Sequence, residues 1–191
     1  FPADRVAFIA ADAGLRCVLT TSTFREKTNQ LPCAVLELDE TVSLLAEQPE
    51  MRTGIQVDPS SLCYIIYTSG TTGRPKGVAV SHANITNFLR VVTPIYNVMR
   101  DDRVYQGMSI AFDFSIEEIW PAWIAGAMLI AGPTDSRRLG HGLTEFLMKH
   151  EVTVLCCVPT LLATIDEDIP SLRSLLVGGE ACPADLVRRW Y

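Results

Sequence analysis

The sequence predicts an α/β fold, with a mainly parallel sheet flanked by helices. Short apolar runs alternate with stretches at helical spacing along most of the chain. Its 191 residues are 48% hydrophobic and 20% charged, as expected of a folded chain that buries a core. Parallel strands joined by helices bind ligands outside the carboxyl ends of the strands, so that edge is where a site is expected.

The first third of the chain predicts one βα alternation. Residues 4–13 have a helical pattern, Gly14 provides a turn, and residues 17–20 form an apolar strand. A second short strand is predicted at residues 34–38. Residues 41–56 mix acidic, proline and glycine residues, which is typical of a connecting segment.

A stronger strand follows at residues 62–67, where the run LCYIIY lacks charge and is rich in β-branched and aromatic residues. We expect it to be buried on both faces. Strand character resumes at residues 78–80. Ser81 can cap a helix running to about Asn97, which Pro94 should end or kink. Its apolar face comprises Ile85, Phe88, Leu89 and Val92.

The rest of the chain continues the alternation of strands and helices. Strands are predicted at residues 104–108, 127–131, 152–156 and 175–177, and helices at residues 115–125, 143–150 and 160–165. A further amphipathic helix begins near Pro183. The chain starts at Phe1 without an initiator methionine and stops at Tyr191 inside that helix, so we expect a fragment of a single domain.

Charge and cysteine content narrow the function classes. The net charge of −6 and pI near 5.0 argue against a nucleic-acid-binding surface. The longest apolar candidate, around residues 119–131, is broken by Pro121 and Gly126 and falls short of the ~20 residues that cross a membrane. The six cysteines show no disulfide or metal spacing, so we expect reduced thiols, no metal site and a cytoplasmic location.

The ten residues TSGTTGRPKG, 68–77, are the most informative segment. Glycines that adopt positive φ bring backbone N–H groups close to a ligand, hydroxyls add donors, and Lys76 adds a mobile positive charge. The segment is neither a Walker A loop nor GxGxxG, and its composition alone also fits a polar surface hairpin. The predicted phosphate-binding residues are Thr68, Ser69, Gly70, Thr71, Thr72, Gly73, Lys76 and Gly77.

The longer string YTSGTTGRPKGV resembles the phosphate loop of the adenylate-forming superfamily, which includes nonribosomal peptide synthetase adenylation domains, acyl-CoA synthetases and luciferases. The resemblance implies a portion of the large N-terminal domain of such an enzyme. It also implies ATP and Mg²⁺, with the metal bridging phosphate oxygens. Lys76 would then act in catalysis by holding the β- and γ-phosphates and the departing pyrophosphate.

A second group of polar residues lies in FDFSIEEIW, residues 112–120. On a helix, Asp113 and Glu117 fall four residues apart on one face, whereas Glu118 points elsewhere. Two acids facing one cavity suit a cationic ligand. The alternative is a helix start enriched in acidic residues by the helix dipole.

This segment resembles the motif that follows the phosphate loop in peptide synthetase adenylation domains. The resemblance implies that Asp113 pairs with the α-ammonium of an amino acid, in a pocket comprising Asp113, Phe114, Glu117, Cys156, Leu176 and Gly178. An acid at Glu117 favours a basic substrate such as lysine, ornithine or diaminobutyrate, because an uncompensated acid in an apolar pocket is costly. The competing interpretation pairs Glu117 with a protein cation and leaves the substrate neutral.

Two further stretches, VTVLCCVPTLL and LRSLLVGGEAC, resemble segments that the same family places beside this pocket and the adenine. The second implies that Gly178, Gly179 and Glu180 lie near the adenine. On its own each stretch also fits an ordinary strand-to-helix turn.

The resemblance implies activation of an amino acid as its adenylate, then transfer to the phosphopantetheine thiol of a carrier protein, with neighbouring synthetase domains in the parent chain. The family's ribose-binding aspartate, hinge and small C-terminal domain with its lysine are absent from these 191 residues. We therefore expect little or no turnover from this chain alone. The alternatives are an acyl- or aryl-CoA ligase fragment and a noncatalytic nucleotide- or phosphate-binding module.

Overall fold

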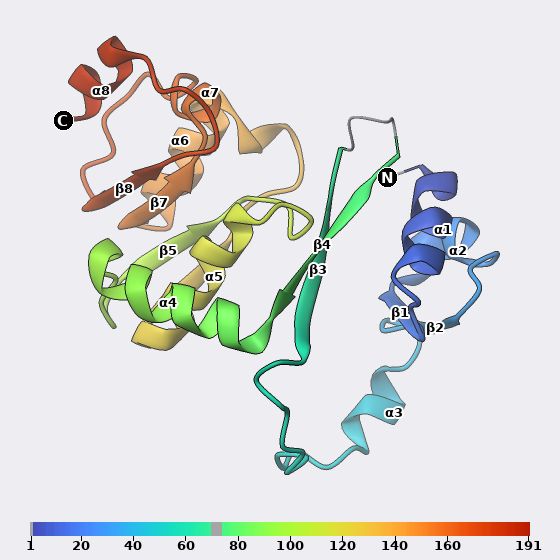
Figure 1. Ribbon diagram of the computed structural model, residues 1–191. Helices are drawn as coiled ribbons and strands as arrows, with labels where there is room; N and C mark the ends of the chain where they lie inside the picture. Colours follow the sequence, from blue (N-terminus) through green and yellow to red (C-terminus); the bar gives the residue numbers. More distant parts are fainter. Residues whose placement is uncertain (1, 70–73) are drawn as a thin grey trace. The chain divides into compact units, whose positions relative to one another are not determined.

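The computed structural model describes residues 2–69 and 74–191, which divide into two compact units, one ending at His82 and the other spanning Ala83–Tyr191 (Figure 1). The first unit begins with α1 (Ala3–Asp12), followed by a turn in which Gly14 has φ of +61°. β1 (Cys17–Thr20) then pairs in parallel with β2 (Ala34–Glu37). The helix, turn and strands predicted here are confirmed to within one residue.

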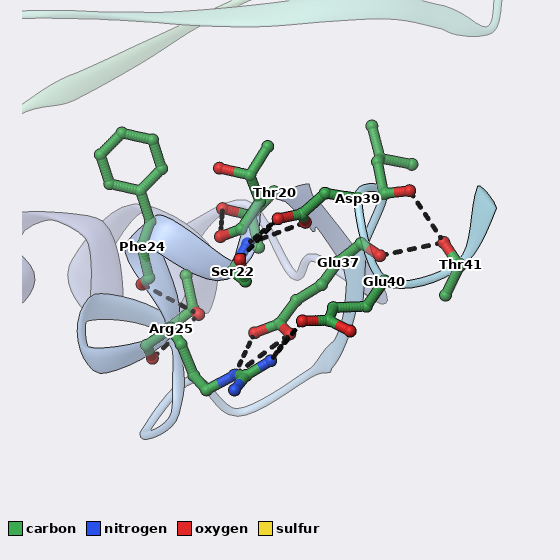
Figure 2. A network of polar contacts seen from close by, with 11 residues as sticks. Thr20, Ser22, Phe24, Arg25, Glu37, Asp39, Glu40 and Thr41 are labelled. Atoms are coloured by element: carbon green, nitrogen blue, oxygen red, sulfur yellow. Dashed lines mark hydrogen bonds and ion pairs between the residues drawn. The ribbon is translucent and has the colours of Figure 1, made fainter.

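The segments after β1 and β2 are held together by polar contacts on the surface of this unit (Figure 2). Two short helical turns, η1 (Ser22–Phe24) and α2 (Arg25–Thr28), follow β1. Arg25 Nε donates to Glu37 Oε1 at 2.8 Å, and Ser22 N donates to Asp39 Oδ1 at 2.9 Å. Because both pairs are solvent-exposed, they fix local geometry more than they stabilise the fold.

The predicted connection at residues 41–56 contains a short helix, α3 (Val42–Ala46). Thr41 Oγ1 donates to the Glu37 carbonyl at 2.9 Å just before it.

β3 (Leu62–Thr68) and β4 (Lys76–Ser81) form an antiparallel two-stranded sheet. The expectation that β3 is buried on both faces is wrong for this chain, since its central residues are only half-buried and Leu62 is 58% exposed. Within the described residues β3 pairs with β4 alone, so the apolar run reflects β-propensity rather than a central place in a sheet. Tyr67 connects β3 to α1 by donating its hydroxyl to Asp12 Oδ2 at 2.6 Å.

The second unit contains a parallel four-stranded sheet in the order β6-β5-β7-β8 (Figure 1). The strands are β5 (Arg103–Gln106), β6 (Met128–Ala131), β7 (Val154–Cys157) and β8 (Ser174–Val177). All four were predicted, and each pair is parallel, which confirms the α/β class. β5 ends two residues before the predicted Met108.

The helices that belong with this sheet are α4 (His82–Tyr96), α5 (Phe114–Ala125), α6 (Gly140–Lys149), α7 (Pro159–Leu162) and α8 (Ala184–Trp190), with a 3₁₀ turn, η2 (Ser136–Arg138). Pro94 does not end α4, which continues to Tyr96 before Asn97 adopts φ of +50°. Within the described part of the chain, no helix has the length and apolar character needed to cross a membrane.

Alternate residues of the strands supply two hydrophobic clusters. Tyr105, Leu155 and Cys157 are buried with Leu143, Leu147 and Leu162, which come from α6 and α7. Their neighbours Val104 and Val154 are buried with Ala122 of α5. Because successive strand residues point to opposite faces, this division places α5 on one face of the sheet and α6 and α7 on the other.

A buried carboxylate joins the amino ends of the strands. Asp102, which is 4% exposed, accepts hydrogen bonds from Met99 N at 2.7 Å and from Thr153 Oγ1 at 2.7 Å, and it pairs with the guanidinium of Arg173. Arg173 also donates to the Asn97 carbonyl at 2.8 Å. Burial works against ionisation, but the Arg173 pair and the other donors hold the pKa of Asp102 below its usual value.

Candidate functional site

A cavity of about 390 Å³ lies in the second unit, between the start of α5 and the turn that follows β8. This position is outside the carboxyl end of a parallel strand, where α/β folds bind ligands. Its lining residues are Tyr96, Phe112, Asp113, Phe114, Glu117, Leu176, Val177, Gly178 and Gly179.

The start of α5 brings two carboxylates to this cavity. Asp113 and Glu117 both line it, as their four-residue spacing predicted. Asp113 occupies the N-cap position without a side-chain capping hydrogen bond. Within residues 2–69 and 74–191, no lysine, arginine or histidine forms an ion pair with either carboxylate. The cavity therefore has an anionic lining.

Glu117 accepts a hydrogen bond at Oε2 from the hydroxyl of Tyr96. Tyr96 is the last residue of α4, and both side chains are half-buried. Burial, followed by the hydrogen bond and the charge of Glu117, raises the pKa of Tyr96 above its ordinary value. Tyr96 was not among the predicted site residues, although its spacing from Val92 continues the apolar face of α4. That signal was present in the sequence, because the helix was predicted to run to about Asn97.

Glu118 points away from the cavity, as predicted, and is completely buried. Its carboxylate accepts from Gly107 N at 3.2 Å, Met108 N at 3.1 Å and Gln106 Nε2 at 3.2 Å. These bonds explain why β5 stops at Gln106, because the next backbone donors turn to Glu118. Burial raises the pKa of Glu118 to about 7, although the hydrogen bonds favour its charged form.

The apolar side of the cavity comes from α5 and β8. A Cβ added to Gly178 would lie 3.6 Å from the Phe114 ring, and Gly179 has φ of +80°. Leu176 lines the cavity on β8, and the neighbouring strand pairs Cys156 with it.

Cys156 itself is buried and is not one of the lining residues. Burial, followed by the charges of Glu118 and Glu117, raises the pKa of its thiol, so the thiol stays neutral. Its register partner Leu176, rather than Cys156 itself, lines the cavity.

Glu180, predicted near the adenine, accepts hydrogen bonds from Thr160 N at 3.2 Å and Thr160 Oγ1 at 3.1 Å. This contact links the turn after β8 to the start of α7.

The residues predicted to bind phosphate belong to the first unit. Gly70, Thr71, Thr72 and Gly73 lie outside the described residues, and Ser69 is exposed. Thr68 and Lys76 are register partners at the ends of β3 and β4, so they flank the loop on its two sides. Lys76 is exposed and begins β4.

Gly77 does not have the positive φ that we expected. It lies in β4 opposite Tyr67, and a Cβ there would meet Ile65 Cγ2 at 2.9 Å and Tyr67 Cζ at 3.1 Å. The glycine is required by the space that two cross-strand side chains occupy, rather than by backbone conformation.

No group of three or more histidine, cysteine or acidic residues in the described ranges could hold a metal ion. A divalent cation at the loop would need ligands from phosphate oxygens.

Comparisons with known proteins place these features in a family. The chain is 40% identical over 189 residues to delta-poly-L-ornithine synthetase of Acinetobacter baumannii, which covers 99% of this chain and 14% of that protein. It is 34% identical over 190 residues to a linear gramicidin synthase of Brevibacillus parabrevis, covering 99% of this chain and 4% of that protein. The chain thus spans a small part of these curated relatives.

Solved structures of a peptide synthetase and of a protein with the same fold also match this chain. The nonribosomal peptide synthetase FmoA3 in its alpha-methyl-L-serine-AMP bound form matches 99% of this chain and 22% of its own, with a TM-score of 0.81 and 29% identity. The N-terminal domain of FACL13 from Mycobacterium tuberculosis matches the whole chain and 51% of its own, with a TM-score of 0.86, and at 19% identity shows the fold alone. The family model described as AMP-binding enzyme matches residues 1–191, so this chain belongs to the AMP-binding enzymes, the adenylate-forming ligases that the phosphate loop predicted, and its relatives are nonribosomal peptide synthetases.

Proposed function

We propose that the protein activates an amino acid with ATP as its aminoacyl adenylate, for loading onto the phosphopantetheine thiol of a carrier protein, and that the amino acid carries a basic side chain. The carrier protein and the neighbouring synthetase domains would be its partners.

The cavity with two carboxylates is the observation that carries this proposal. An amino acid with a basic side chain has two ammonium groups, one at the α-carbon and one at the end of the side chain. Asp113 is free to pair with the first and Glu117 with the second, because neither carboxylate has a protein cation as its partner within the described residues. A charge-assisted hydrogen bond in a partly desolvated pocket is stronger than a neutral one.

The remaining lining favours a slender aliphatic chain. Phe114, Leu176 and Gly178 line the same cavity and offer apolar contact, and the volume of about 390 Å³ is within the range of small-molecule sites. A fatty or aryl acid would bring no cation to either carboxylate, so a CoA ligase of such acids fits this cavity poorly.

The phosphate loop supplies the other half of the proposal. Thr68 and Lys76 flank the loop in register, and Lys76 is exposed to solvent, so its ammonium is available to phosphate oxygens. We assign phosphate binding to Thr68, Ser69, Lys76 and Gly77, together with the loop residues Gly70 to Gly73. Mg²⁺ would arrive bound to the phosphate oxygens of ATP.

The chemistry begins when the substrate carboxylate attacks the α-phosphorus of ATP and pyrophosphate leaves. Lys76 would stabilise the negative charge on the departing pyrophosphate, and Asp113 would orient the amino acid by its α-ammonium. In the second half-reaction the carrier thiol attacks the acyl carbonyl and AMP leaves.

One relative supports the proposal that the substrate amino acid has a basic side chain. Delta-poly-L-ornithine synthetase, 40% identical to this chain, takes its name from a polymer of a diamino acid. The linear gramicidin synthase, 34% identical to this chain, has a name that points to another product, so the argument for a basic substrate rests on Glu117.

The test is amino-acid-dependent ATP–pyrophosphate exchange by the full-length protein, with ornithine, lysine, diaminobutyrate, leucine, phenylalanine and a fatty acid. We expect the fastest exchange with a diamino acid. Asp113→Asn should reduce exchange with every amino acid by about 100-fold, because a charge-assisted hydrogen bond contributes about 1.5–3 kcal/mol. Glu117→Gln should reduce exchange only with diamino acids. Exchange led by leucine would overturn the role of Glu117, and silence towards all amino acids would overturn amino acid activation.

A further inference from the structure

We propose that Tyr96 determines specificity by positioning the Glu117 carboxylate, so that the pocket prefers a side chain ending in an ammonium group over a neutral one of the same length. This inference rests on the proposed activation of a basic amino acid. It assigns the role to a residue of α4, outside the α5 and β8 segments that the sequence motifs identify.

Tyr96 lies at the cavity, at the point where the end of α4 contacts the first turn of α5. It is one of the lining residues, and its hydroxyl donates to Oε2 of Glu117, which comes from the first turn of α5. A glutamate side chain has several rotatable bonds, so a fixed donor that holds one oxygen limits where the other can go.

The tyrosine backbone is itself well anchored. Tyr96 closes α4, the next residue Asn97 has φ of +50°, and the Asn97 carbonyl accepts from Arg173 at 2.8 Å. Arg173 is in turn paired with the buried Asp102. The end of α4 that carries the phenol is therefore tied by hydrogen bonds to Arg173, which immediately precedes β8.

The chemistry of the donor decides what Glu117 offers a ligand. A lysine or arginine in place of Tyr96 would neutralise the carboxylate, whereas a phenol donates a hydrogen bond and leaves the negative charge in place. Oε2 is occupied by Tyr96, and Oε1 has no partner within the described residues. A substrate ammonium can therefore complete the pair.

Tyr96→Phe in the full-length enzyme tests the proposal, because the change removes only the hydroxyl. The measurement is kcat and KM for ATP–pyrophosphate exchange with two isosteric pairs, ornithine with norleucine and lysine with 2-aminoheptanoic acid. We expect the preference for the diamino acid, as a ratio of kcat/KM values, to fall about 10-fold, consistent with loss of one hydrogen bond to a charged group. The loss should appear mainly in KM for ornithine or lysine, with norleucine and 2-aminoheptanoic acid unchanged.

The ratio separates specificity from folding, because a smaller folded fraction lowers kcat for all four substrates equally. Tyr105→Phe is the matched control, since it removes a hydroxyl from the core of the same unit, and Tyr105 is not a lining residue. In a Glu117→Gln background, Tyr96→Phe should produce no further change in the ratio.

Two outcomes overturn the inference. If the wild-type enzyme prefers diamino acids and Tyr96→Phe keeps the wild-type ratio, the role of Tyr96 fails while the proposed function stands. If the wild-type enzyme shows no preference for the diamino member of either pair, the basic-substrate assignment fails and the role of Tyr96 fails with it.

Discussion

Glu117 and Glu118 are adjacent residues of the same type with opposite environments. Glu117 lines the cavity and is half-buried, while Glu118 is fully buried against the end of β5 and accepts hydrogen bonds from Gly107 and Met108. One step along a helix turns a side chain by about 100°, which is enough to separate a ligand-facing acid from a structural one.

Glu118 should make local stability fall as pH rises. Its pKa in the folded protein is about 7 against an ordinary 4.5, so between these values the folded state binds the proton more tightly than the unfolded state. The contribution of Glu118 is therefore most favourable below pH 4.5 and declines until about pH 7. Glu118→Gln should remove a decline of about 3 kcal/mol, since each pKa unit between 4.5 and about 7 corresponds to about 1.4 kcal/mol.

Hydrogen exchange of peptides covering residues 103–120, corrected for intrinsic rates and compared between pH 5 and pH 8, measures this change. Glu145→Gln, at an exposed position on α6, is the matched control. Equal pH dependence of the opening free energy in wild type and Glu118→Gln would contradict the prediction.

Among the elements of the second unit, Asp102 connects the turn after α4 to the starts of β7 and β8. Its partners Met99, Thr153 and Arg173 lie on different segments. The carboxylate therefore holds these segments together at the amino ends of the strands, opposite the edge where the cavity lies. It also supports Asn97, and through it the position of Tyr96.

Asp102→Ala should destabilise the unit by about 3–5 kcal/mol, because it leaves the guanidinium of Arg173 without its buried partner. The pKa of Asp102 is below its ordinary 3.8, so the stabilisation is complete above that value and is lost as pH falls through the lower folded pKa. Urea unfolding at pH 7 measures the loss. Asp101→Ala, at the exposed neighbouring aspartate, should cost less than about 0.5 kcal/mol, and an equal cost for the two variants would refute the role of the cluster.

Element boundaries show what could be predicted at this scale. The four strands of the parallel sheet follow from short apolar runs bounded by turns, and all four were found from the sequence. The burial of β3 could not be predicted in the same way. It depends on which surfaces pack around the strand, and local propensity carries no information about packing partners.

The two candidate functional regions belong to separate units, the predicted phosphate loop to the first and the carboxylate-lined cavity to the second. Substitution of Lys76 tests whether the first region binds phosphate. Lys76→Ala in the full-length enzyme should lower kcat for pyrophosphate exchange by about 100-fold, comparable to removal of one donor to a developing negative charge. Stability should change little, because the Lys76 side chain is exposed.

Arg74→Ala is the control for a general effect of positive charge, since Arg74 is an exposed cation two residues away. We expect it to retain most of the wild-type kcat. Equal activity in Lys76→Ala and wild type would favour the interpretation of TSGTTGRPKG as a noncatalytic hairpin.

The sequence by itself determined the α/β class, the AMP-binding family and the pairing of Asp113 with Glu117 on one side of a helix, because these depend on local spacing and on a contiguous motif. Only the tertiary structure decided that Tyr96 contacts Glu117, that Cys156 is buried and does not line the cavity, and that Gly77 is required by the side chains of Ile65 and Tyr67. Each of these contacts joins residues that are distant along the chain or on paired strands. The physical reason is that spacing sets the direction of a side chain within its own element, whereas the packing of elements sets what that side chain meets.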